Sequence, residues 1–352
     1  MGVFVFLPLV LPLTAWPVAR LADRHLHPRT ATRLLTALAA VMALCSTLCL
    51  ALLMVVGTAQ LPGNPLPDGW SDPEVRAALP FDEIAGTAAI PALIAVCGAL
   101  ARTLWRHVAV RRRGWRALAG LPGRSVAVLP DEEEAYAYAL PGRGRGHERR
   151  GGRGDGRGSG RGGRLDQAGQ AGQAGEGGRA RRLAPGGRVV VSRALLDRLQ
   201  PAERRALFAH ERAHLAARHH RFLLVTQLAA RANPFLLPLR TATAYTAERW
   251  ADEEAAGVVR DRRVVARAIG KAALAPGRTP APTLAGFAAA GPVPRRVAAL
   301  LAPAPAARTR PPLFTAVGLA LWGAACGTAV SAMSSANAAV TMVVVLRAAT
   351  PL

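Results

Sequence analysis

Four apolar stretches constrain what this 352-residue chain can fold into. They cover residues 3–19, 34–56, 84–104 and 313–332. Because about 20 apolar residues in a helix cross a bilayer, we expect four transmembrane helices. The first stretch lacks a basic leading segment and a cleavage site, so we interpret it as a span and not as a removable signal peptide. The apolar tail at 336–346 is too short to predict a fifth span.

These stretches divide the chain into three parts. Residues 1–105 are expected to hold three spans, residues 106–310 a soluble domain, and residues 311–352 the fourth span with its short tail. The loop after the first span and the segment after the third span are rich in arginine, whereas the loop between the second and third spans is acidic. The positive-inside rule therefore predicts a multipass cell-membrane protein with its N-terminus outside and its soluble domain in the cytoplasm.

The formal charge of +23 allows two interpretations. A charge of this size can indicate nucleic-acid binding, but nearly all of it is arginine, and Lys271 is the single lysine. Much of the arginine flanks apolar segments or lies in a glycine-rich tract. We therefore interpret the charge first as a cytoplasmic membrane signal and only second as a nucleic-acid footprint.

The middle region predicts a small α+β domain. Residues 125–129, 135–140 and 188–192 have the composition of short strands, and Ser192 is placed to cap a helix over 193–199. Between the second and third of these strands, residues 141–187 consist largely of Gly, Arg, Ala and Gln. Such a segment cannot bury enough apolar surface to fold, so we expect a disordered insertion.

A His-Glu-x-x-His motif lies in this domain, on a helix that Pro201 and Glu203 open. His210 and His214 are four residues apart, so one helical face presents both imidazoles to a single point, as a metal ion requires. Glu211 lies beside that point, where a carboxylate can take a proton from water. The motif predicts a zinc peptidase site. The four cysteines lie in apolar stretches and are expected to be small buried hydrophobes, so the site must use His and carboxylate ligands.

Two candidates compete for the third protein ligand. His220 has the spacing of the metzincin motif, but Ala217 stands where that motif has glycine. If the helix continues through Ala217, His220 lies about 240° around the axis from His214 and faces away. His219 is also off the ligand face, and both suit surface positions or contacts behind the ligands better.

The other candidate is Glu248, which lies one helical turn before Asp252 on an expected helix over 241–257. A glutamate on a second helix can complete a His, His, Glu site, and an aspartate one turn later can hold a ligating histidine by its other nitrogen. We prefer this candidate. Tyr245 is a possible oxyanion partner by its position, although a packed aromatic side chain is the stronger interpretation.

With these elements assembled, the chain resembles the BlaR/MecR-type membrane metallopeptidases, relatives of the HtpX-like gluzincins. The resemblance rests on residues 189–192, Leu195 with Leu196, residues 207–215 and Glu248-x-x-x-Asp252, and on three spans before the domain and one after it. It implies an α-helical multipass membrane protein with an inserted α+β gluzincin-type, minimal zincin, metallopeptidase domain. It also implies one Zn²⁺ held by His210, His214 and Glu248, with Glu211 as general base and Asp252 behind the ligands.

The resemblance further implies that the strand at 135–139 pairs with the backbone of a protein substrate. A plain edge strand is an equal alternative. In the penicillin sensors a large extracellular domain with a Ser-x-x-Lys nucleophile follows the last span. Here Ala268 stands three residues before Lys271, so β-lactam sensing is not expected.

Three functions remain open from the sequence. The first is an endopeptidase for signalling or regulated proteolysis at the cytoplasmic face, with a transcriptional repressor as one candidate substrate. The second is HtpX-like quality control of membrane proteins. The third is a non-catalytic scaffold in which the Gly/Arg tract binds RNA or anionic lipid.

Overall fold

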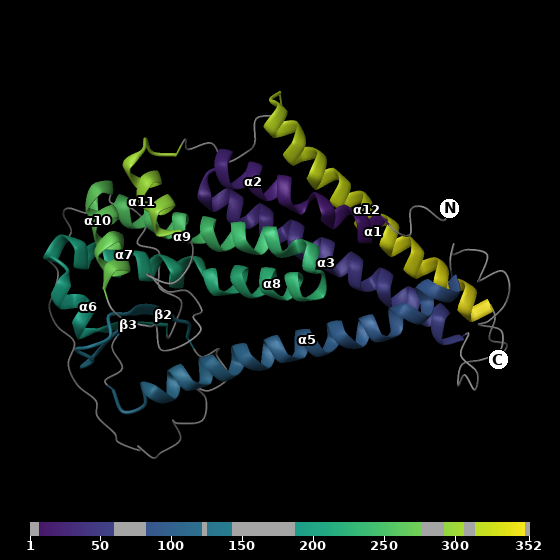
Figure 1. Cartoon of the computed structure of the whole chain (residues 1–352), viewed down its shortest axis with the longest axis horizontal. Coiled ribbons are helices and arrows are strands. Elements are labelled where there is room, and N and C mark those ends of the chain that lie inside the picture. The colour runs from purple at the N-terminus through teal and green to yellow at the C-terminus, as the bar shows by residue number, and fades with distance from the viewer. Residues whose placement is uncertain are drawn as a thin grey trace, which may run out of the picture.

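The protein is elongated, with long helices at one end and a small sheet covered by shorter helices at the other (Figure 1). The computed structural model describes residues 7–59, 82–121, 125–142, 187–275, 292–305 and 314–348. The insertion expected at 141–187 lies almost wholly outside the described residues. The architecture is mostly helical with one small mixed sheet, as expected.

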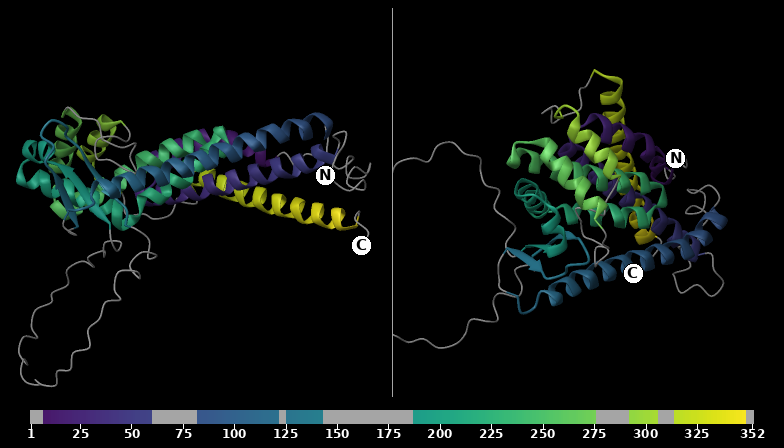
Figure 2. Two further views of the ribbon diagram at one scale, coloured as in Figure 1. Left: turned by 90° about the horizontal axis from the view of Figure 1, so that it is seen from below. Right: turned by 60° about the vertical axis from the view of Figure 1, so that its left-hand side comes forward.

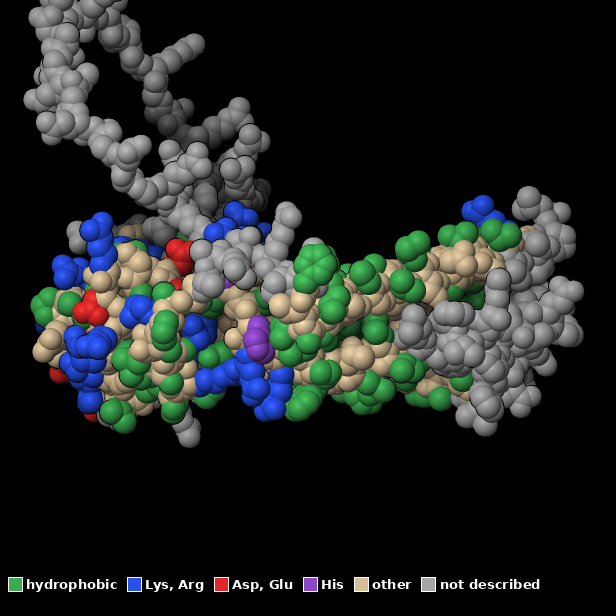
Figure 3. All heavy atoms as spheres, turned by 90° about the horizontal axis from the view of Figure 1, so that it is seen from above, with side chains coloured by type: hydrophobic (Ala, Val, Ile, Leu, Met, Phe, Trp, Pro, Cys, Tyr) green, Lys and Arg blue, Asp and Glu red, His purple; other side chains and the backbone are tan. Residues whose placement is uncertain are grey.

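Three helices are long and apolar enough to cross a membrane. They are α3 (Pro28–Ala59), α5 (Asp82–Ala117) and α12 (Ala316–Ala348). They contain the expected spans at 34–56, 84–104 and 313–332, apart from residues 313–315, which precede α12. The tail at 336–346 continues α12 as the same helix. In Figure 3 the basic side chains gather toward the sheet end, and most of the elongated helical end is hydrophobic.

The first expected span does not form one continuous helix. Its described part consists of α1 (Leu7–Val10), the 3-10 helix η2 (Leu11–Thr14) and α2 (Ala15–His25). Proline cannot donate a backbone hydrogen bond, and Pro12 lies at the start of η2. Small residues of α2 are buried in a cluster that also contains residues of α3, α9 and α12. None of these segments is among the three helices able to span by length and composition, and a crossing here stays a prediction.

The cysteines divide into two groups. Cys45 and Cys49 of α3 are buried, as expected, whereas Cys97 of α5 and Cys326 of α12 are exposed. The expectation of burial was wrong for the second pair, because α5 and α12 have few neighbours over much of their length (Figure 1).

The sheet contains the three expected strands, β1 (Val126–Leu129), β2 (Ala137–Leu140) and β3 (Arg188–Ser192). Their order is β1-β3-β2, with β1 parallel to β3 and β2 antiparallel to it. Strand β3 is central because its valines are buried on both faces of the sheet. Strand β2 therefore lies at an edge, next to α7.

Helices that cover the sheet begin at well-formed caps. Ser192 accepts a hydrogen bond from the amide of Leu195 and starts α6 (Arg193–Arg198), as expected. Gln200 and Glu203 form a capping box at the start of α7 (Pro201–Ala217), and Asp261 caps α10 (Arg262–Leu274). Helix α11 (Val293–Leu301) packs on α10, and this end of the molecule has its own apolar core.

Helices α8 (His219–Ala232) and α9 (Leu237–Val259) form a hairpin through the short η4 (Pro234–Leu236) and lie along α3. At its tip, the Asn233 amide donates to the Ser46 hydroxyl at 3.0 Å, and Ser46 donates to the carbonyl of Pro8 at 2.7 Å. The largely apolar residues 222–239 thus form most of α8, the turn η4 and the start of α9. The hairpin of α8 and α9 is therefore anchored to α3, one of the three candidate membrane spans.

Helices α3 and α5 touch at Gly57 and Gly86, where a Cβ on Gly57 would overlap the carbonyl group of Gly86. Small residues allow such close approach between membrane helices. We expect Gly57→Val to destabilise the detergent-solubilised protein by about 1–3 kcal/mol, because overpacking forces the backbones apart. Thermal unfolding measures this, with Gly323→Val of α12 as the control, since open space surrounds Gly323. Equal stability of both variants would contradict the contact.

Glu203 ties the start of α7 to α10. Its carboxylate accepts from the backbone N–H of Gln200 at 2.9 Å and from Lys271 Nζ at 2.7 Å. Burial raises the pKa of Glu203, but these two donors outweigh it and the net pKa lies below the ordinary value. The stability from the carboxylate is therefore present above the unfolded pKa near 4.3 and is lost as pH falls through the lower folded pKa.

We expect Glu203→Gln to lower stability at pH 7 by about 1–2 kcal/mol, and the difference from wild type to shrink below about pH 4. Thermal unfolding as a function of pH measures it. Asp197→Asn removes one exposed carboxylate nearby and serves as the control. A pH-independent difference would show that the charge of Glu203 does not contribute.

Candidate metal centre

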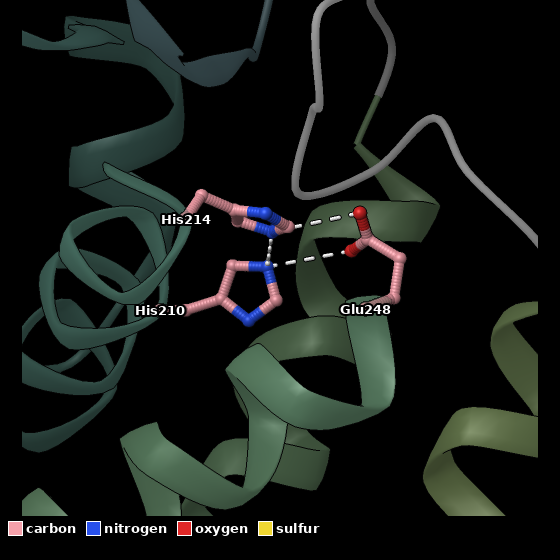
Figure 4. A group of neighbouring side chains, drawn as sticks. All are labelled: His210, His214 and Glu248. Atoms are coloured by element: carbon pink, nitrogen blue, oxygen red, sulfur yellow. Dashed lines mark hydrogen bonds and ion pairs between the residues drawn. The ribbon is translucent and has the colours of Figure 1, made fainter. Parts of the chain in front are cut away.

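Helices α7 and α9 bring three metal-ligating side chains together in the interior. His210 and His214 project from one face of α7, as their spacing predicted, and Glu248 projects toward them from α9 (Figure 4). All three are buried, with exposed fractions of 2% or less. The two Nε2 atoms are 3.0 Å apart, and the Glu248 carboxylate oxygens lie 3.4 Å from His210 Nε2 and 3.5 Å from His214 Nε2.

These separations fit a tetrahedral zinc ion. Zinc–nitrogen and zinc–oxygen bonds of about 2.0–2.1 Å place neighbouring ligand atoms of a tetrahedron about 3.3 Å apart. The three ligand-to-ligand distances lie close to that value. Two imidazole nitrogens and one carboxylate are also a donor set that catalytic zinc commonly uses, with a fourth position left for water.

Formal charge points to a cation as well. Glu211, Glu248 and Asp252 contribute three carboxylates to this buried region, and Arg296 of α11 contributes one guanidinium. Among these four groups two negative charges are in excess. Buried charge is costly unless it is paired, and a divalent cation would cancel this excess.

Asp252 and Arg296 lie directly behind the ligands. Asp252 Oδ1 is 3.0 Å from Nδ1 of His210, so Asp252 holds that ring by the nitrogen that faces away from Glu248. Arg296 donates to both oxygens of Asp252, at 2.9 and 2.7 Å, and its Nη1 lies 3.2 Å from Glu248 Oε2. The arginine therefore bridges the carboxylate on the metal side and the carboxylate behind the histidine.

Mutual attraction shifts the pKa values of these groups. Burial raises the pKa of Glu248, but His214 and Arg296 outweigh it and hold the pKa well below its ordinary value. Burial also raises the pKa of Asp252, and Arg296 and His210 likewise bring it below the ordinary value. Burial lowers the pKa of Arg296, and Asp252 and Glu248 more than restore it, so the guanidinium stays charged.

The two histidines differ. Burial lowers the pKa of His210, but Asp252 and Glu248 raise it to about 9, so this imidazole carries a proton at neutral pH while no cation is bound. For His214 burial dominates, and its pKa lies below the ordinary value. A metal ligand must be deprotonated, so a metal at this site would displace the proton of His210.

His219 supports the second histidine. Its Nδ1 lies 2.8 Å from Nδ1 of His214, and its ring packs against Trp250 with centroids 4.6 Å apart. It is fully buried, so of the two positions weighed from the sequence, the surface and a contact behind the ligands, the second is correct. His219 thus orients the ring of His214, just as Asp252 orients the ring of His210.

From the sequence, His220 faces away if the helix continues through Ala217, and this condition is not met. The helix ends there, and Arg218 adopts the left-handed conformation (φ 57°) before α8 starts at His219. His220 nevertheless stays away from the metal group, because the new helix turns it toward α5, where it lines a cavity. The helix break at Arg218, which occurs without a glycine, brings His219 and not His220 next to His214.

Two other residues were considered from the sequence. Glu211 is fully buried one residue after His210. Tyr245 is buried, and the Arg295 guanidinium lies 4.1 Å above its ring centroid, so it is a packed aromatic side chain. Arg296 was not predicted, because one arginine on a short helix reads as a surface residue when 45 Lys and Arg are present. A weak signal existed, since Arg296 lies among apolar residues on the face of α11 that contains Leu300.

Residues 181–230 match Peptidase family M48. This segment contains β3, α6, α7 and most of α8, and therefore the His-Glu-x-x-His helix but not Glu248 or Arg296. No curated protein and no solved structure matches the chain. The family match and the buried His, His, Glu group agree on one chemistry. The chain contains a segment that matches Peptidase family M48, beside three helices long and apolar enough to cross a membrane, and it is a metalloendopeptidase.

Proposed function

We propose that the protein is a zinc endopeptidase of the cell membrane that cleaves a protein substrate at the cytoplasmic face. The observation that carries the proposal is the buried convergence of His210, His214 and Glu248, with Glu211 on the same helix. The two histidines and Glu248 would hold one Zn²⁺. When bound, this ion supplies a Lewis acid that polarises the scissile carbonyl and lowers the pKa of water.

Glu211 is the proposed general base. It takes a proton from the attacking water and delivers it to the leaving amine, the role that a carboxylate beside a metal site commonly has. The site excludes bulk water, because Glu211 and all three ligands are buried. Exclusion of water strengthens each electrostatic interaction that the reaction uses.

Asp252, Arg296 and His219 are proposed as positioning residues. Asp252 fixes the ring of His210, His219 fixes the ring of His214, and Arg296 fixes Asp252 and Glu248 together. Such contacts behind the ligands set ring orientation and raise metal affinity. The ligands then need no reorganisation when the metal binds.

Substrate is proposed to pair with β2. Among the described residues this strand pairs with β3 alone, and it lies against α7, which carries both histidines. An extended peptide can add to such an edge by main-chain hydrogen bonds. The position at the edge supports the expectation from the sequence that residues 135–139 receive substrate.

The proposed orientation and role have separate supports. Arginines at the sheet end of α5, among them Arg102, Arg106 and Arg113, favour a cytoplasmic position for the peptidase domain. A role in signalling or regulated proteolysis rests on the resemblance to BlaR/MecR-type peptidases in the order of spans and the Glu-x-x-x-Asp motif. A transcriptional repressor is the corresponding candidate substrate.

The central test uses two variants that separate base from ligand. We expect Glu211→Gln to lower casein cleavage by the purified protein about 10²–10⁴-fold while bound zinc remains, because only the proton acceptor is lost. Glu248→Gln should lose both cleavage and zinc. Exposed Glu133→Gln is the matched control. Intact cleavage by the Glu211 variant would overturn the assignment.

Arg296→Gln tests the contact behind the ligands. We expect a zinc affinity about 10–100-fold lower, because Glu248 and the Asp252–His210 pair lose their shared anchor. Competition with a chromophoric chelator measures it, with exposed Arg263→Gln as the control. Loss of a buried charge partner also destabilises, so Arg296→Lys, which keeps the charge, is compared. If both Arg296 variants unfold like wild type and bind zinc equally well, the positioning role is wrong.

A further inference from the structure

A cavity of about 970 Å³ lies between α5 and α8, away from the metal centre. The two helices pack against each other, and α5 runs alongside the helical part of the molecule in Figure 2. Its lining includes Arg102, Arg106 and Arg113 of α5 and Leu223, Leu224 and Arg231 of α8.

The lining combines positive charge with an apolar strip. Arg102, Arg106 and Arg113 follow one face of α5 at helical spacing, and Arg231 lies on α8 across from that helix. None of the described lining residues is acidic, and these four arginines have no ion pair with a described carboxylate. Leu223 and Leu224 supply apolar surface between the charges.

The position of the cavity along α5 indicates its depth relative to a bilayer. Residues 84–101 are an apolar run that rises about 27 Å as a helix, close to the thickness of a bilayer's hydrocarbon core. Arg102 is the first charged residue after this run, and Trp105, 69% exposed, follows it by about one turn. Tryptophan and arginine at the end of an apolar run mark the headgroup level of a bilayer.

The hairpin tip lies farther into the apolar part of the molecule, because Asn233 contacts Ser46 in the middle of α3. Phe235 and Leu237 are 58% and 49% exposed, and they follow Arg231 closely in the chain. Exposed apolar side chains at that depth suit contact with the acyl chains of lipid. The cavity therefore extends from the headgroup level at Arg102 toward the acyl chains.

His220 does not add to the positive charge. Burial, with neighbouring Arg221 and Arg111, lowers its pKa to about 4, so the imidazole is neutral at pH 7. The charge of the cavity comes from guanidinium groups, whose planar forks match phosphate oxygens.

We propose that this cavity binds the phosphate headgroup of an anionic phospholipid, with the arginines on the phosphate and the leucines of α8 against the start of an acyl chain. Basic pockets between membrane helices are suited to such headgroups. The site is separate from the metal centre, and it links the bilayer to α8, the helix that begins with His219. Lipid binding here does not depend on the proposed peptidase chemistry.

The test compares two pairs of substitutions on α5 in the full-length protein. Arg102→Gln with Arg106→Gln removes two arginines of the cavity. Arg112→Gln with Arg116→Gln removes two exposed arginines of the same helix that do not line it, so net charge and topology signal are matched. Each protein is titrated in detergent with phosphatidylglycerol, with phosphatidylcholine and with inorganic phosphate, and bound lipid is counted by native mass spectrometry.

We expect wild type and the control pair to bind phosphatidylglycerol alike, and the cavity pair to bind it about tenfold or more weakly. Phosphatidylcholine and inorganic phosphate should bind weakly to all three proteins. Equal losses in both pairs would overturn the proposal, because general surface charge would then explain binding. Inorganic phosphate that competes as strongly as the lipid would also overturn it, in favour of a small-anion site.

Discussion

The bridge that Arg296 makes between Asp252 and Glu248 is the interaction on which the metal centre depends. Two carboxylates one helical turn apart on α9 would repel each other and resist burial. A guanidinium between them pairs with both. Glu248 then keeps Oε2 toward His210 and Oε1 toward His214, and Asp252 keeps Oδ1 toward His210. Three helices, α7, α9 and α11, meet at this bridge. The site is therefore held together by charge pairing among buried side chains.

Much of the site could be predicted because local spacing determines it. His210 with His214, and Glu248 with Asp252, are pairs four residues apart, so secondary structure alone puts each pair on one face. The strands, the Ser192 cap and the start of α7 were likewise local patterns. What joins the two helices is Arg296, 44 residues beyond Asp252, and nothing local separates it from many surface arginines. The end of α7 at Ala217 could not be predicted either. Arg218 adopts a left-handed conformation there, and no glycine or asparagine in the sequence signals it.

The membrane part shows the limits of hydropathy. Length and composition predicted α3, α5 and α12 correctly, because each is a continuous apolar run. They did not predict that prolines divide residues 7–25 into short helices that pack among α3, α9 and α12. Nor did they show that the α8–α9 hairpin lies along α3, which couples Asn233 to Ser46. Tertiary contacts of this kind depend on which faces meet, and hydropathy averages over faces.

The pairing of Leu140 with Arg188 has a consequence for how this chain can vary. These residues are neighbours across the sheet, so the connection between them begins and ends at nearly the same place. The entropy cost of closing such a connection grows only with the logarithm of its length, and each doubling costs about 0.6 kcal/mol. Residues can therefore be gained or lost there without moving β2, β3 or α7. A change of chain length between β2 and β3 is therefore expected to leave the register of the two strands unchanged.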